Sequence, residues 1–474
     1  MAESLQADIC VIGAGSAGLS IAAGASQMGA RTVLIEKGKM GGDCLNYGCV
    51  PSKSLLVAAK AAVAGRAASR FGLRYGEPQI DFPAVHHHVH DVIAAIAPMD
   101  SVERFRGLGV TVLQSAARFA GPQEVIADGT RIAVRRVVVA TGSQPMVPPI
   151  PGLDTVPFLT NETVFDLTQQ PDHLIVIGGG PIGCELGQAF RRLGARVSLV
   201  EMAGIMPKDD PELVELVRTS LRRDGVELFE QTKVVAVERA GAGVAVAVER
   251  DGEASRIEGT HLLLAAGRRP TVEGLDLEAA GVAYDARGIS VDARLRTSNK
   301  KIYAAGDVAG GYQFTHVAGY HAGIVIRNAL FRLPAKAETR AIPWVTFTSP
   351  ELAHVGLTEP EARKAHGEIR VLRWPFAEND RAQAERQTDG LVKAIVRPGG
   401  QLLGASIVGP QAGELIQPWV LALSQKLKIG AMATMVAPYP TLGEVSKRAA
   451  GSFFVPKLFS PRTKAIVRFL SRFG

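Results

Sequence analysis

The sequence predicts an α/β protein with two copies of one strand–turn–helix unit and a C-terminal region of mixed strands and helices. Three observations predict it. An apolar strand that runs into a glycine-rich turn and a helix occurs near the start of the chain and again about 165 residues later, and the pattern changes from about Ala341. The chain has 474 residues, enough for two to four domains at roughly 100–200 residues each.

The first unit occupies the start of the chain. Its strand is the short apolar run Asp8–Ile12, which is typical of a strand buried on both faces. An Ala-rich helix then runs to about Gly29, and a second strand over Thr32–Ile35 ends in Glu36. The glycines of the turn between strand and helix are Gly13, Gly15 and Gly18. Such glycines let the backbone approach a pyrophosphate at a helix N-terminus, and an acid about 20 residues later accepts from a ribose hydroxyl.

The second unit repeats this order. Its strand is Leu174–Ile177, its helix carries Glu185, and its second strand, Val197–Val200, leads into Glu201. The glycines of its turn are Gly178, Gly180 and Gly183. A proline-rich segment from Pro145 to Pro151 lies between the units and predicts a domain crossing. Two matches in the same context predict two dinucleotide sites.

The acid of the second unit bears on the choice of nucleotide. The carboxylate of Glu201 suits a ribose 2′-hydroxyl and repels a 2′-phosphate, which favours NADH over NADPH. Arg196 and the following loop are placed to compensate, so NADPH stays open.

Later segments complete the predicted organisation. Two more apolar strands end in a glycine, within Leu262–Gly267 and Ile302–Asp307. From about Ala341, beginning with Trp344–Phe347, mixed strands and helices follow with no glycine-rich phosphate loop. We expect a third domain there that binds no nucleotide.

Composition excludes several classes of protein. The four cysteines are too few for a disulfide scaffold and indicate a cytoplasmic protein. No stretch reaches 18 apolar residues, and no signal peptide is expected. The net charge is +7, of which the segment Val455–Gly474 supplies +5 with no acid. The rest is nearly neutral, so nucleic-acid binding is not expected.

One cluster of histidines is not expected to bind metal. His86 and His90 lie four residues apart in a probable helix, but Asp91 points off their face and no cysteine is near. Because a full ligand set is missing, a solvated helix face is the preferred interpretation.

The sharpest local feature is the segment Gly41–Lys53, which holds Cys44 and Cys49. Two buried thiols are the plain alternative. The segment is instead rich in glycine and polar residues and closely follows the first unit. A redox pair needs one accessible thiolate to attack and a second to resolve the mixed disulfide. Lys53 would lower a neighbouring thiol pKa or pair with a carboxylate.

These motifs resemble the pyridine nucleotide–disulfide oxidoreductases with a Cys-x4-Cys centre, the family of lipoamide dehydrogenase, glutathione reductase and mercuric reductase. The resemblance runs to about residue 455. Besides both glycine turns and the cysteine segment, it rests on Ala140–Ser143, Ala266–Pro270 and Ala305–Val308. It implies a homodimer with two Rossmann-like domains and an α+β dimerisation domain. The implied parts are an FAD-binding domain (1–150 and 270–340), an NAD(P)-binding domain (151–269), a dimerisation domain (341–455) and a basic amphipathic tail (456–474).

The resemblance also implies roles for single residues. Cys49 would be the thiol beside the flavin that forms a charge-transfer complex, and Cys44 the interchange thiol facing the substrate. Lys53 would lie near the flavin N5 and pair with Glu185. Asp307 would accept from the ribitol chain of FAD. The other implied cofactor-binding residues are Gly13, Gly15, Gly18, Glu36, Thr141 and Gly142 for FAD, Gly178, Gly180, Gly183 and Glu201 for NAD(P)H, and Gly267 in the third motif.

The pattern of the family breaks in the third domain. Disulfide-reducing members carry His-Pro-x-x-x-Glu there, the His serving as acid–base for the interchange thiol. Here Tyr439 replaces that His, while Glu444 is present. A phenol with a pKa of about 10 is a poor base at pH 7, so efficient turnover of lipoamide or glutathione is doubtful. Tyr439 packing at the interface without a catalytic role is the alternative.

Mercuric reductases also show a Tyr near this place, because a metal–thiolate needs no proton shuttle. Their C-terminal cysteine pair is absent here, since no cysteine follows Cys184. We therefore expect electrons to pass from NAD(P)H through FAD and Cys44–Cys49 to a small disulfide or a thiol-bound metal. A quinone or oxygen reductase at a membrane, and a flavoprotein redox sensor, are the alternatives.

The tail interleaves aromatic and aliphatic residues with cations from Lys457 to Arg472. This is typical of a basic amphipathic helix on an anionic membrane or a partner. A helix docked on its own dimer is the alternative.

Overall fold

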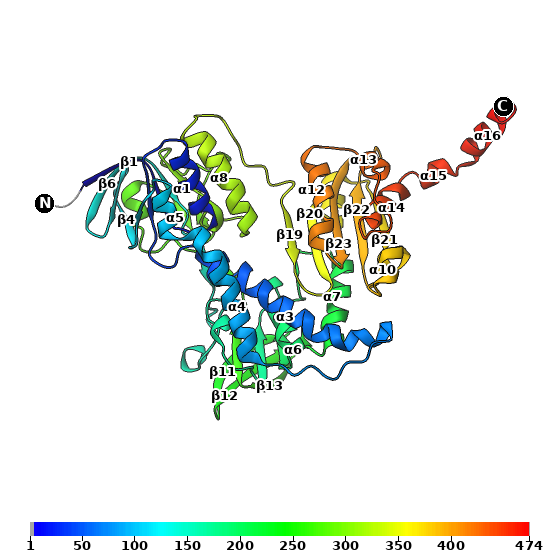
Figure 1. Ribbon diagram of the computed structural model, residues 1–474, viewed down its shortest axis with the longest axis horizontal. Helices are drawn as coiled ribbons and strands as arrows, with labels where there is room; N and C mark the ends of the chain where they lie inside the picture. The colour runs from blue at the N-terminus through cyan, green and yellow to red at the C-terminus, as the bar shows by residue number, and fades with distance from the viewer. Residues whose placement is uncertain (1–3, 474) are drawn as a thin grey trace. The chain divides into compact units, whose positions relative to one another are not determined.

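The computed structural model describes residues 4–473, and its contacts divide the chain into two compact units. Unit 1 comprises residues 1–67, 74–202 and 228–338, and unit 2 comprises 68–73, 203–227 and 339–474. Figure 1 labels the elements of both. Among the described residues, no helix combines the length and the apolar character needed to cross a bilayer.

Unit 1 contains a sheet built on the first strand–turn–helix unit. The strand order is β3-β2-β1-β6-β5-β4, and β18 pairs with β6. The strands of this sheet are β1 (Ser4–Ile12), β2 (Thr32–Ile35), β3 (Thr111–Leu113), β4 (Ala117–Gly121), β5 (Glu124–Ala127), β6 (Thr130–Val139) and β18 (Ile302–Ala304).

Burial on both faces explains the apolar run Ile9–Ile12 that ends β1. Ile9 and Val11 belong to one core cluster, which also holds residues of α1 (Ser16–Gln27) and α8 (Thr315–Ala329). Cys10 and Ile12 belong to the cluster on the opposite face. Successive side chains of a strand point to opposite faces, so a strand covered on both sides has no polar positions. Figure 1 shows α1 and α8 next to each other.

The second strand–turn–helix unit builds another parallel arrangement in unit 1. β8 (His173–Ile177) pairs in parallel with β9 (Arg196–Val200) and with β14 (His261–Leu264), and α6 (Pro181–Arg192) follows β8. Ile175 and Ile177 pack against valines of an antiparallel three-stranded sheet. The remaining elements of unit 1 are α2 (Gly42–Asn46), α3 (Cys49–Ala67), α4 (Phe82–Ile96), α5 (Val102–Gly107), β7 (Ser143–Pro145), β11 (Lys233–Ala240), β12 (Gly243–Arg250), β13 (Glu253–Gly259), β15 (Arg268–Pro270), β16 (Tyr284–Asp285) and β17 (Gly288–Ile289).

Unit 2 is a five-stranded antiparallel sheet with helices, as expected for a third domain without a phosphate loop. Its strand order is β19-β20-β23-β22-β21, and the buried Trp419 of α12 belongs to its core. The strands are β19 (Pro343–Thr346), β20 (Glu351–Gly356), β21 (Arg370–Pro375), β22 (Leu391–Val396) and β23 (Leu402–Gly409). The helices are α7 (Pro211–Asp224), α9 (Glu359–His366), α10 (Asp380–Ala384), α11 (Ala412–Leu415), α12 (Gln417–Ser424), α13 (Ile429–Thr434), α14 (Glu444–Ser452), α15 (Val455–Leu458) and α16 (Pro461–Leu470).

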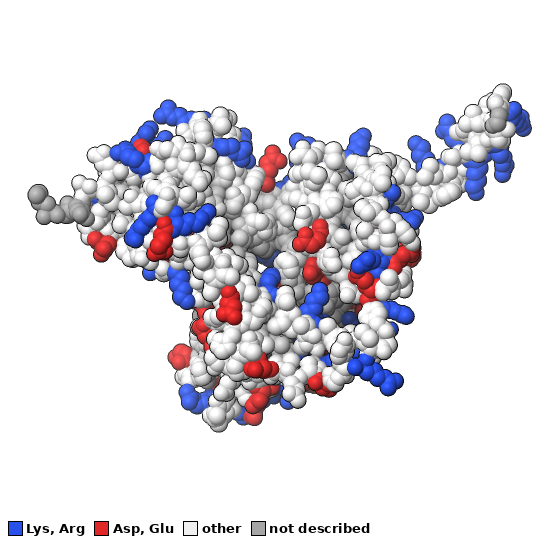
Figure 2. All heavy atoms as spheres, in the orientation of Figure 1, with Lys and Arg blue, Asp and Glu red and all other residues white. Residues whose placement is uncertain are grey.

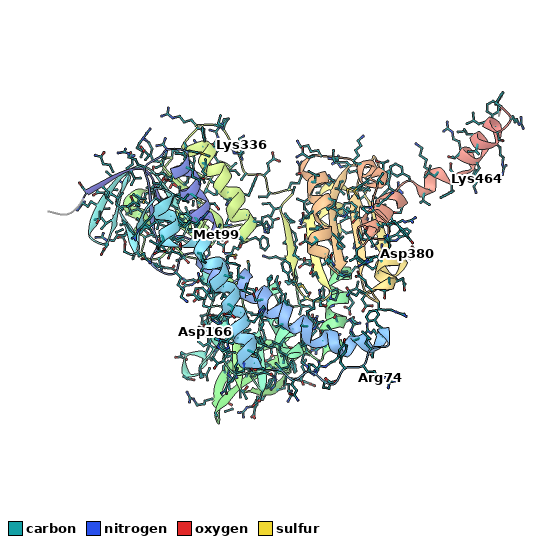
Figure 3. All side chains as sticks on the ribbon, viewed as in Figure 1. Arg74, Met99, Asp166, Lys336, Asp380 and Lys464 are labelled. Atoms are coloured by element: carbon teal, nitrogen blue, oxygen red, sulfur yellow. The ribbon has the colours of Figure 1, made fainter. Side chains whose placement is uncertain are left out.

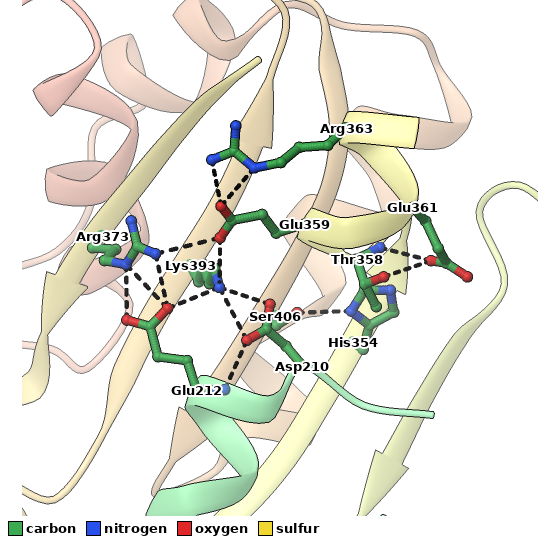
Figure 4. Close-up of polar contacts among 10 residues, drawn as sticks. All are labelled: Asp210, Glu212, His354, Thr358, Glu359, Glu361, Arg363, Arg373, Lys393 and Ser406. Carbon is green, nitrogen blue, oxygen red and sulfur yellow. Dashed lines mark hydrogen bonds and ion pairs between the residues drawn. The ribbon is translucent and has the colours of Figure 1, made fainter. Parts of the chain in front are cut away.

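A buried cation joins distant segments of unit 2 (Figure 4). The Lys393 ammonium lies 2.8 Å from carboxylate oxygens of Asp210, Glu212 and Glu359, and its side chain is 4% exposed. Arg373 makes a second ion pair with Glu212 at 2.8 Å. A buried charge is tolerated only when it is paired, so these contacts fix residues 203–227 to the sheet of unit 2. The four-part division expected from the sequence stays a prediction.

Candidate functional site

The first glycine turn is shaped by the backbone around it. Gly13 has φ +104°, and a Cβ there would lie 2.4 Å from the carbonyl oxygen of Ala140. A Cβ on Gly18 would lie 1.8 Å from the oxygen of Gly13. Neither position has room for a side chain, whereas a Cβ on Gly15, the N-cap of α1, would meet nothing closer than 4.0 Å. The turn is therefore closely packed at Gly13 and Gly18 and open at Gly15. Gly15 lies at the N-terminus of α1, a position that favours an anion.

The second turn repeats these contacts closely. Gly178 has φ +115°, and a Cβ there would lie 2.3 Å from the oxygen of Ala265; a Cβ on Gly183 would lie 1.9 Å from the oxygen of Gly178. Gly180, the N-cap of α6, is open. The two turns are thus equivalent in three dimensions as well as in sequence.

The acid that follows each turn contacts the turn itself. Glu36 Oε2 accepts a 2.6 Å hydrogen bond from the backbone N–H of Ala14, and Glu201 Oε2 accepts one of 2.6 Å from Gly179. A carboxylate at this place would accept from a ribose hydroxyl of a dinucleotide whose pyrophosphate sat at the helix N-terminus. These two cradles fit the adenosine halves of FAD and of NAD(P)H.

The other predicted FAD contacts lie in one hydrogen-bonded group. Asp307, in the turn Gly306–Ala309, accepts a 2.6 Å bond from Ser143 Oγ, and burial raises the pKa of its carboxyl. Thr141 Oγ1 donates to the oxygen of Thr271 at 2.6 Å. Gly142 and Gly267 both have positive φ, +67° and +116°. Gly142 directly precedes β7 and Gly267 directly precedes β15, the two strands of a small antiparallel sheet. A polar group at Asp307 suits the ribitol hydroxyls of FAD.

The two cysteines lie in adjacent helical segments. Cys44 lies in α2, and Cys49 is the first residue of α3. A hydrogen bond from Cys44 is the largest cause that lowers the pKa of Cys49 to about 6. The same contact, with burial, raises the pKa of Cys44. Thr315 Oγ1, at the start of α8, lies 3.4 Å from Cys49 Sγ and also lowers its pKa. The pair therefore holds one thiolate, on Cys49, near neutral pH.

Lys53 and Glu185 form the ion pair that the resemblance implies. Lys53 Nζ donates to Glu185 Oε2 at 2.8 Å. The Lys53 side chain is 36% exposed, but that of Glu185 is only 6% exposed. One turn of α3 separates Lys53 from Cys49, and its positive charge contributes to the lowered pKa of that thiol. The contact connects the cysteine segment with the helix of the second glycine turn.

Sequence reasoning missed a second set of contacts beside Cys44. Arg268 makes a 3.0 Å ion pair with Asp43, and its Nε donates to Ser143 Oγ at 2.8 Å. Asn161 Nδ2 donates to Asp43 Oδ1 at 3.1 Å and to the oxygen of Tyr47 at 3.1 Å. Ser143 in turn donates to Asp307, so these bonds link the cysteine segment to the FAD side. Ser143 and Arg268 belong to the family motifs Ala140–Ser143 and Ala266–Pro270, but no sequence signal marked Asn161.

Tyr439 and Glu444 belong to unit 2. Tyr439 is 71% exposed, and its hydroxyl donates a 3.0 Å bond to Asp380, labelled in Figure 3; this bond raises the pKa of the phenol. Glu444 is the first residue of α14. No hydrogen bond between Tyr439 and Glu444 is found in the described chain. Whether Tyr439 takes part in catalysis stays a prediction.

The histidines of α4 and the other cysteines lie outside this group. The rings of His86 and His90 stack at 4.0 Å between centroids, and within residues 4–473 no three His, Cys, Asp or Glu side chains are placed to hold a metal ion. Cys10 is fully buried, which raises the pKa of its thiol to about 12. Cys184 is buried and donates to the oxygen of Gly179.

Comparison with known proteins gives one family. The family model described as pyridine nucleotide-disulphide oxidoreductase matches residues 7–322, and that of its dimerisation domain matches 342–450. A mercuric reductase of Streptomyces lividans is 38% identical over 455 residues, covering 94% of this chain and 96% of the relative. A dihydrolipoyl dehydrogenase of Thermus scotoductus is 38% identical over 461 residues, with coverage of 94% and 96%.

Two solved structures share the fold. The Cu(II) complex of the HOCl-induced flavoprotein disulfide reductase RclA from Escherichia coli is similar with a TM-score of 0.83 at 28% identity, covering 92% of this chain and 98% of that one. LpdA from Mycobacterium tuberculosis gives a TM-score of 0.86 at 29% identity, with coverage of 94% and 99%. The dimerisation domain supports a homodimer. The chain belongs to the pyridine nucleotide-disulphide oxidoreductases, enzymes that use FAD and NAD(P)H.

Proposed function

We propose that this enzyme uses NAD(P)H, with NADH favoured, to reduce a thiol-bound metal ion through Cys44 and Cys49, a small disulfide being the other acceptor of this class. The observation that carries the proposal is the placement of two free thiols in adjacent segments, with Thr315 Oγ1 3.4 Å from Cys49 Sγ and Lys53 one helical turn away; the contact between the two cysteines lowers the pKa of Cys49 and raises that of Cys44. Two adjacent sulfurs in this state suit both thiol exchange and a thiophilic metal.

The binding residues for the cofactors follow from the two cradles. Gly13, Gly15, Gly18 and Glu36 would hold the adenosine half of FAD, and Asp307 its ribitol. Gly178, Gly180, Gly183 and Glu201 would hold NAD(P)H. When bound, FAD supplies the transfer of two electrons from the nicotinamide to the cysteine pair.

The electron balance is the same for either acceptor. A disulfide RSSR accepts two electrons from the Cys44–Cys49 dithiol: Cys44 sulfur bonds to one sulfur as the other leaves as a thiol, and Cys49 then displaces the second thiol and closes the Cys44–Cys49 disulfide. One NAD(P)H and one proton reduce that disulfide again. For Hg(II) held by two thiolates, the Cys44–Cys49 dithiol gives up two electrons and two protons, which yields zero-valent mercury, two thiols and the Cys44–Cys49 disulfide; for Cu(II), which takes one electron per ion, one dithiol reduces two ions to Cu(I).

Tyr439 decides between the two acceptors. Disulfide exchange needs a proton moved at each step, and loss of such help costs on the order of 10²–10⁴ in rate. The hydrogen bond to Asp380 raises the pKa of the Tyr439 phenol, so less phenolate is present near neutral pH to accept a proton. Exchange of a metal between thiolates needs no such base, which favours the metal–thiolate. The S. lividans relative is named mercuric reductase, and RclA, which is named a disulfide reductase, was solved as a Cu(II) complex.

The cytoplasmic location is part of the same proposal. A cytoplasmic thiol pool would supply thiol-bound metal. The homodimer is expected to complete the acceptor site.

A panel assay tests the proposal. Purified flavoenzyme is given NADH or NADPH and each of a dithiothreitol complex of Hg(II), a Cu(II)–glutathione mixture, lipoamide, glutathione disulfide and a quinone. We expect the highest kcat/KM with a metal–thiol complex and with NADH. Cys44→Ser and Cys49→Ser should abolish that turnover, whereas Cys10→Ala, a matched loss of a buried sulfur, should retain it. Turnover of quinone or oxygen that survives both Ser variants, with none of metal or disulfide, would refute the proposal.

A further inference from the structure

The C-terminal segment of unit 2 has an exposed apolar face. In α15, α16 and the residues around them, every large apolar side chain is strongly exposed; Phe459 and Phe473 reach 66% and 74%. The others are Val455, Leu458, Ile466, Val467, Phe469 and Leu470, each at least 45% exposed. Neither helix contains a buried residue. Aromatic and aliphatic side chains at this density on one short segment mark an interaction surface.

The sequence of α16 specifies the helix locally. Ser460 is its N-cap, accepting a 3.2 Å bond from the backbone N–H of Thr463, and Pro461 takes the first helical position, where its missing N–H costs nothing. A helix this short is marginal alone in water, so burial of its apolar face would stabilise it.

Two basic residues of α16 and its apolar stripe lie on different faces, whereas Arg462, four residues before Ile466, lies at the N-terminal end of the stripe itself. Ile466, Phe469, Leu470 and Phe473 follow the spacing i, i+3, i+4 and i+7, which places them on one stripe. The rings of Phe469 and Phe473 confirm it, with centroids 5.2 Å apart. Lys464 and Arg468, four residues apart, line another face, and Arg472 lies in the turn after the helix.

The charge of the segment has one sign. From Val455 to Gly474 there are five cations and no acid; they are Lys457, Arg462, Lys464, Arg468 and Arg472. None of the five makes an ion pair within residues 4–473. On the face seen in Figure 2, basic atoms gather on α16 without an acidic neighbour. Figure 3 labels Lys464 on this helix.

The segment lies beyond the part of the chain shared with the family. The model of the dimerisation domain ends at residue 450, so the common dimer interface does not require α15 and α16. The rest of the chain carries a net charge of only +2, because the segment supplies five of the formal +7. The rest of the chain therefore offers these cations no net negative charge.

We propose that α15 and α16 bind the enzyme to the surface of a membrane rich in anionic lipid, with the stripe of Ile466, Phe469, Leu470 and Phe473 in the acyl boundary and the cations at the headgroups. A helix with one apolar and one basic face lies in the plane of such a surface. With 10 residues, α16 is too short to span it. Aromatic rings supply the apolar contact, and each cation near an anionic surface raises the affinity about five-fold.

The test uses the complete flavoenzyme and sedimentation with vesicles. Vesicles of equal parts phosphatidylglycerol and phosphatidylcholine are compared with vesicles of phosphatidylcholine alone. We expect binding to the first only, and weaker binding as salt rises, because salt screens exposed charges. Joint substitution of Lys464→Glu, Arg468→Glu and Arg472→Glu should lower the affinity more than about 100-fold.

Two further variants separate charge from the apolar face. A control with the same change of charge, Lys60→Glu, Lys336→Glu and Lys364→Glu at exposed positions outside the segment, should bind within a few-fold of the wild type. Phe469→Ser with Phe473→Ser keeps every charge and should still weaken binding at least 10-fold. NADH oxidation should be unchanged in all of them, since no residue of the segment belongs to the cofactor or cysteine sites.

Three outcomes would overturn the proposal. The first is wild-type enzyme that stays in the supernatant with anionic vesicles. The second is binding that persists after residues 455–474 are removed or after the three charge reversals. The third is a loss of dimer mass by light scattering in the truncated enzyme without any vesicle binding of the wild type, which would assign the segment to the enzyme's own dimer.

Discussion

Lys53 donates a 2.8 Å hydrogen bond to Glu185, and so a residue four positions after Cys49 is paired with the helix that follows the second glycine turn. The carboxylate is buried while the lysine is half-exposed. The lysine therefore has two effects: it neutralises a buried acid, and it stabilises the thiolate of Cys49.

Replacement of Lys53 should affect electron transfer more than folding. In Lys53→Met, loss of the charge beside Cys49 is expected to slow reduction of the enzyme by NADH on the order of 10², the scale for removing one preorganised electrostatic partner. Rapid-mixing absorbance of the flavin measures it. Lys60→Met, on an exposed position of the same helix, is the control. Equal rates in both variants would remove Lys53 from the site.

The lowered pKa of Cys49 predicts the pH dependence of its reactivity. In the dithiol enzyme, alkylation of Cys49 by iodoacetamide should rise through a midpoint near pH 6, because the thiolate is the nucleophile. Below that pH the sulfur is protonated and should react slowly. Cys44, whose pKa is raised, should react only in alkali. Mass spectrometry of the alkylated peptides assigns each site.

Thr315→Val tests whether the hydroxyl of Thr315 helps to lower the pKa of Cys49. Removal of the hydroxyl 3.4 Å from Cys49 should move that midpoint upward. An unchanged midpoint would show that Thr315 does not stabilise the thiolate.

The identity of residue 439 should decide turnover of disulfides. Tyr439→His restores a side chain that titrates near neutrality, and we expect lipoamide reduction to rise at least 10-fold with a pH profile that reflects an imidazole. Tyr439→Phe loses only the bond to Asp380 and should leave metal reduction within about two-fold. Steady-state kinetics against pH distinguishes the three forms. No gain in Tyr439→His would mean that the position lies outside the disulfide site.

Removal of the Lys393 charge should destabilise unit 2. Lys393→Met leaves three carboxylates without their shared cation, and loss of one partner of a buried pair lowers the free energy of unfolding by about 3–5 kcal/mol. Urea denaturation followed by tryptophan fluorescence reports on it, because Trp344, Trp374 and Trp419 all lie in unit 2. Lys364→Met, exposed on α9, should change stability little.

Glu212 predicts how this unit responds to acid. A hydrogen bond from Arg373 is the main cause that lowers the pKa of Glu212 from 4.5 to about 2. A depressed carboxyl pKa stabilises the fold above the unfolded value and loses that effect as pH falls through the folded value. The stability difference between wild type and Glu212→Gln should therefore be constant above pH 4.5 and shrink towards pH 2. A difference that grows in acid would contradict the assigned ion pairs.

The sequence predicted what local patterns determine. The structure confirms the strands at Asp8–Ile12 and Leu174–Ile177, both glycine turns and the helices after them. Burial on two faces requires a short apolar run, and a turn without room for side chains requires glycine, so both can be recognised within a few residues of sequence. The α/β fold, the family, the enzyme class and the cofactors FAD and NAD(P)H are confirmed as well. The metal acceptor, the single-residue roles and the domain boundaries stay predictions.

Long-range polar contacts left no such marks. Lys393 lies 183 residues from Asp210, and Arg268 lies 107 residues from Asn161. Each contact depends on how separate strands and helices come together, and a single lysine or asparagine in the sequence looks the same whether it is paired or solvated. The ion pair of Lys53 with Glu185 was expected only through the resemblance to the family.

Glu36 and Glu201 each hold an amide of the loop that would carry the pyrophosphate, so one side chain sets both the shape of a loop and the fit of a sugar. Shortening either to aspartate would withdraw the oxygen from both tasks at once. The order of the glycine turn and the affinity for nucleotide would then decline together. A variant that changed the preference for one sugar would therefore also loosen the turn that binds the pyrophosphate.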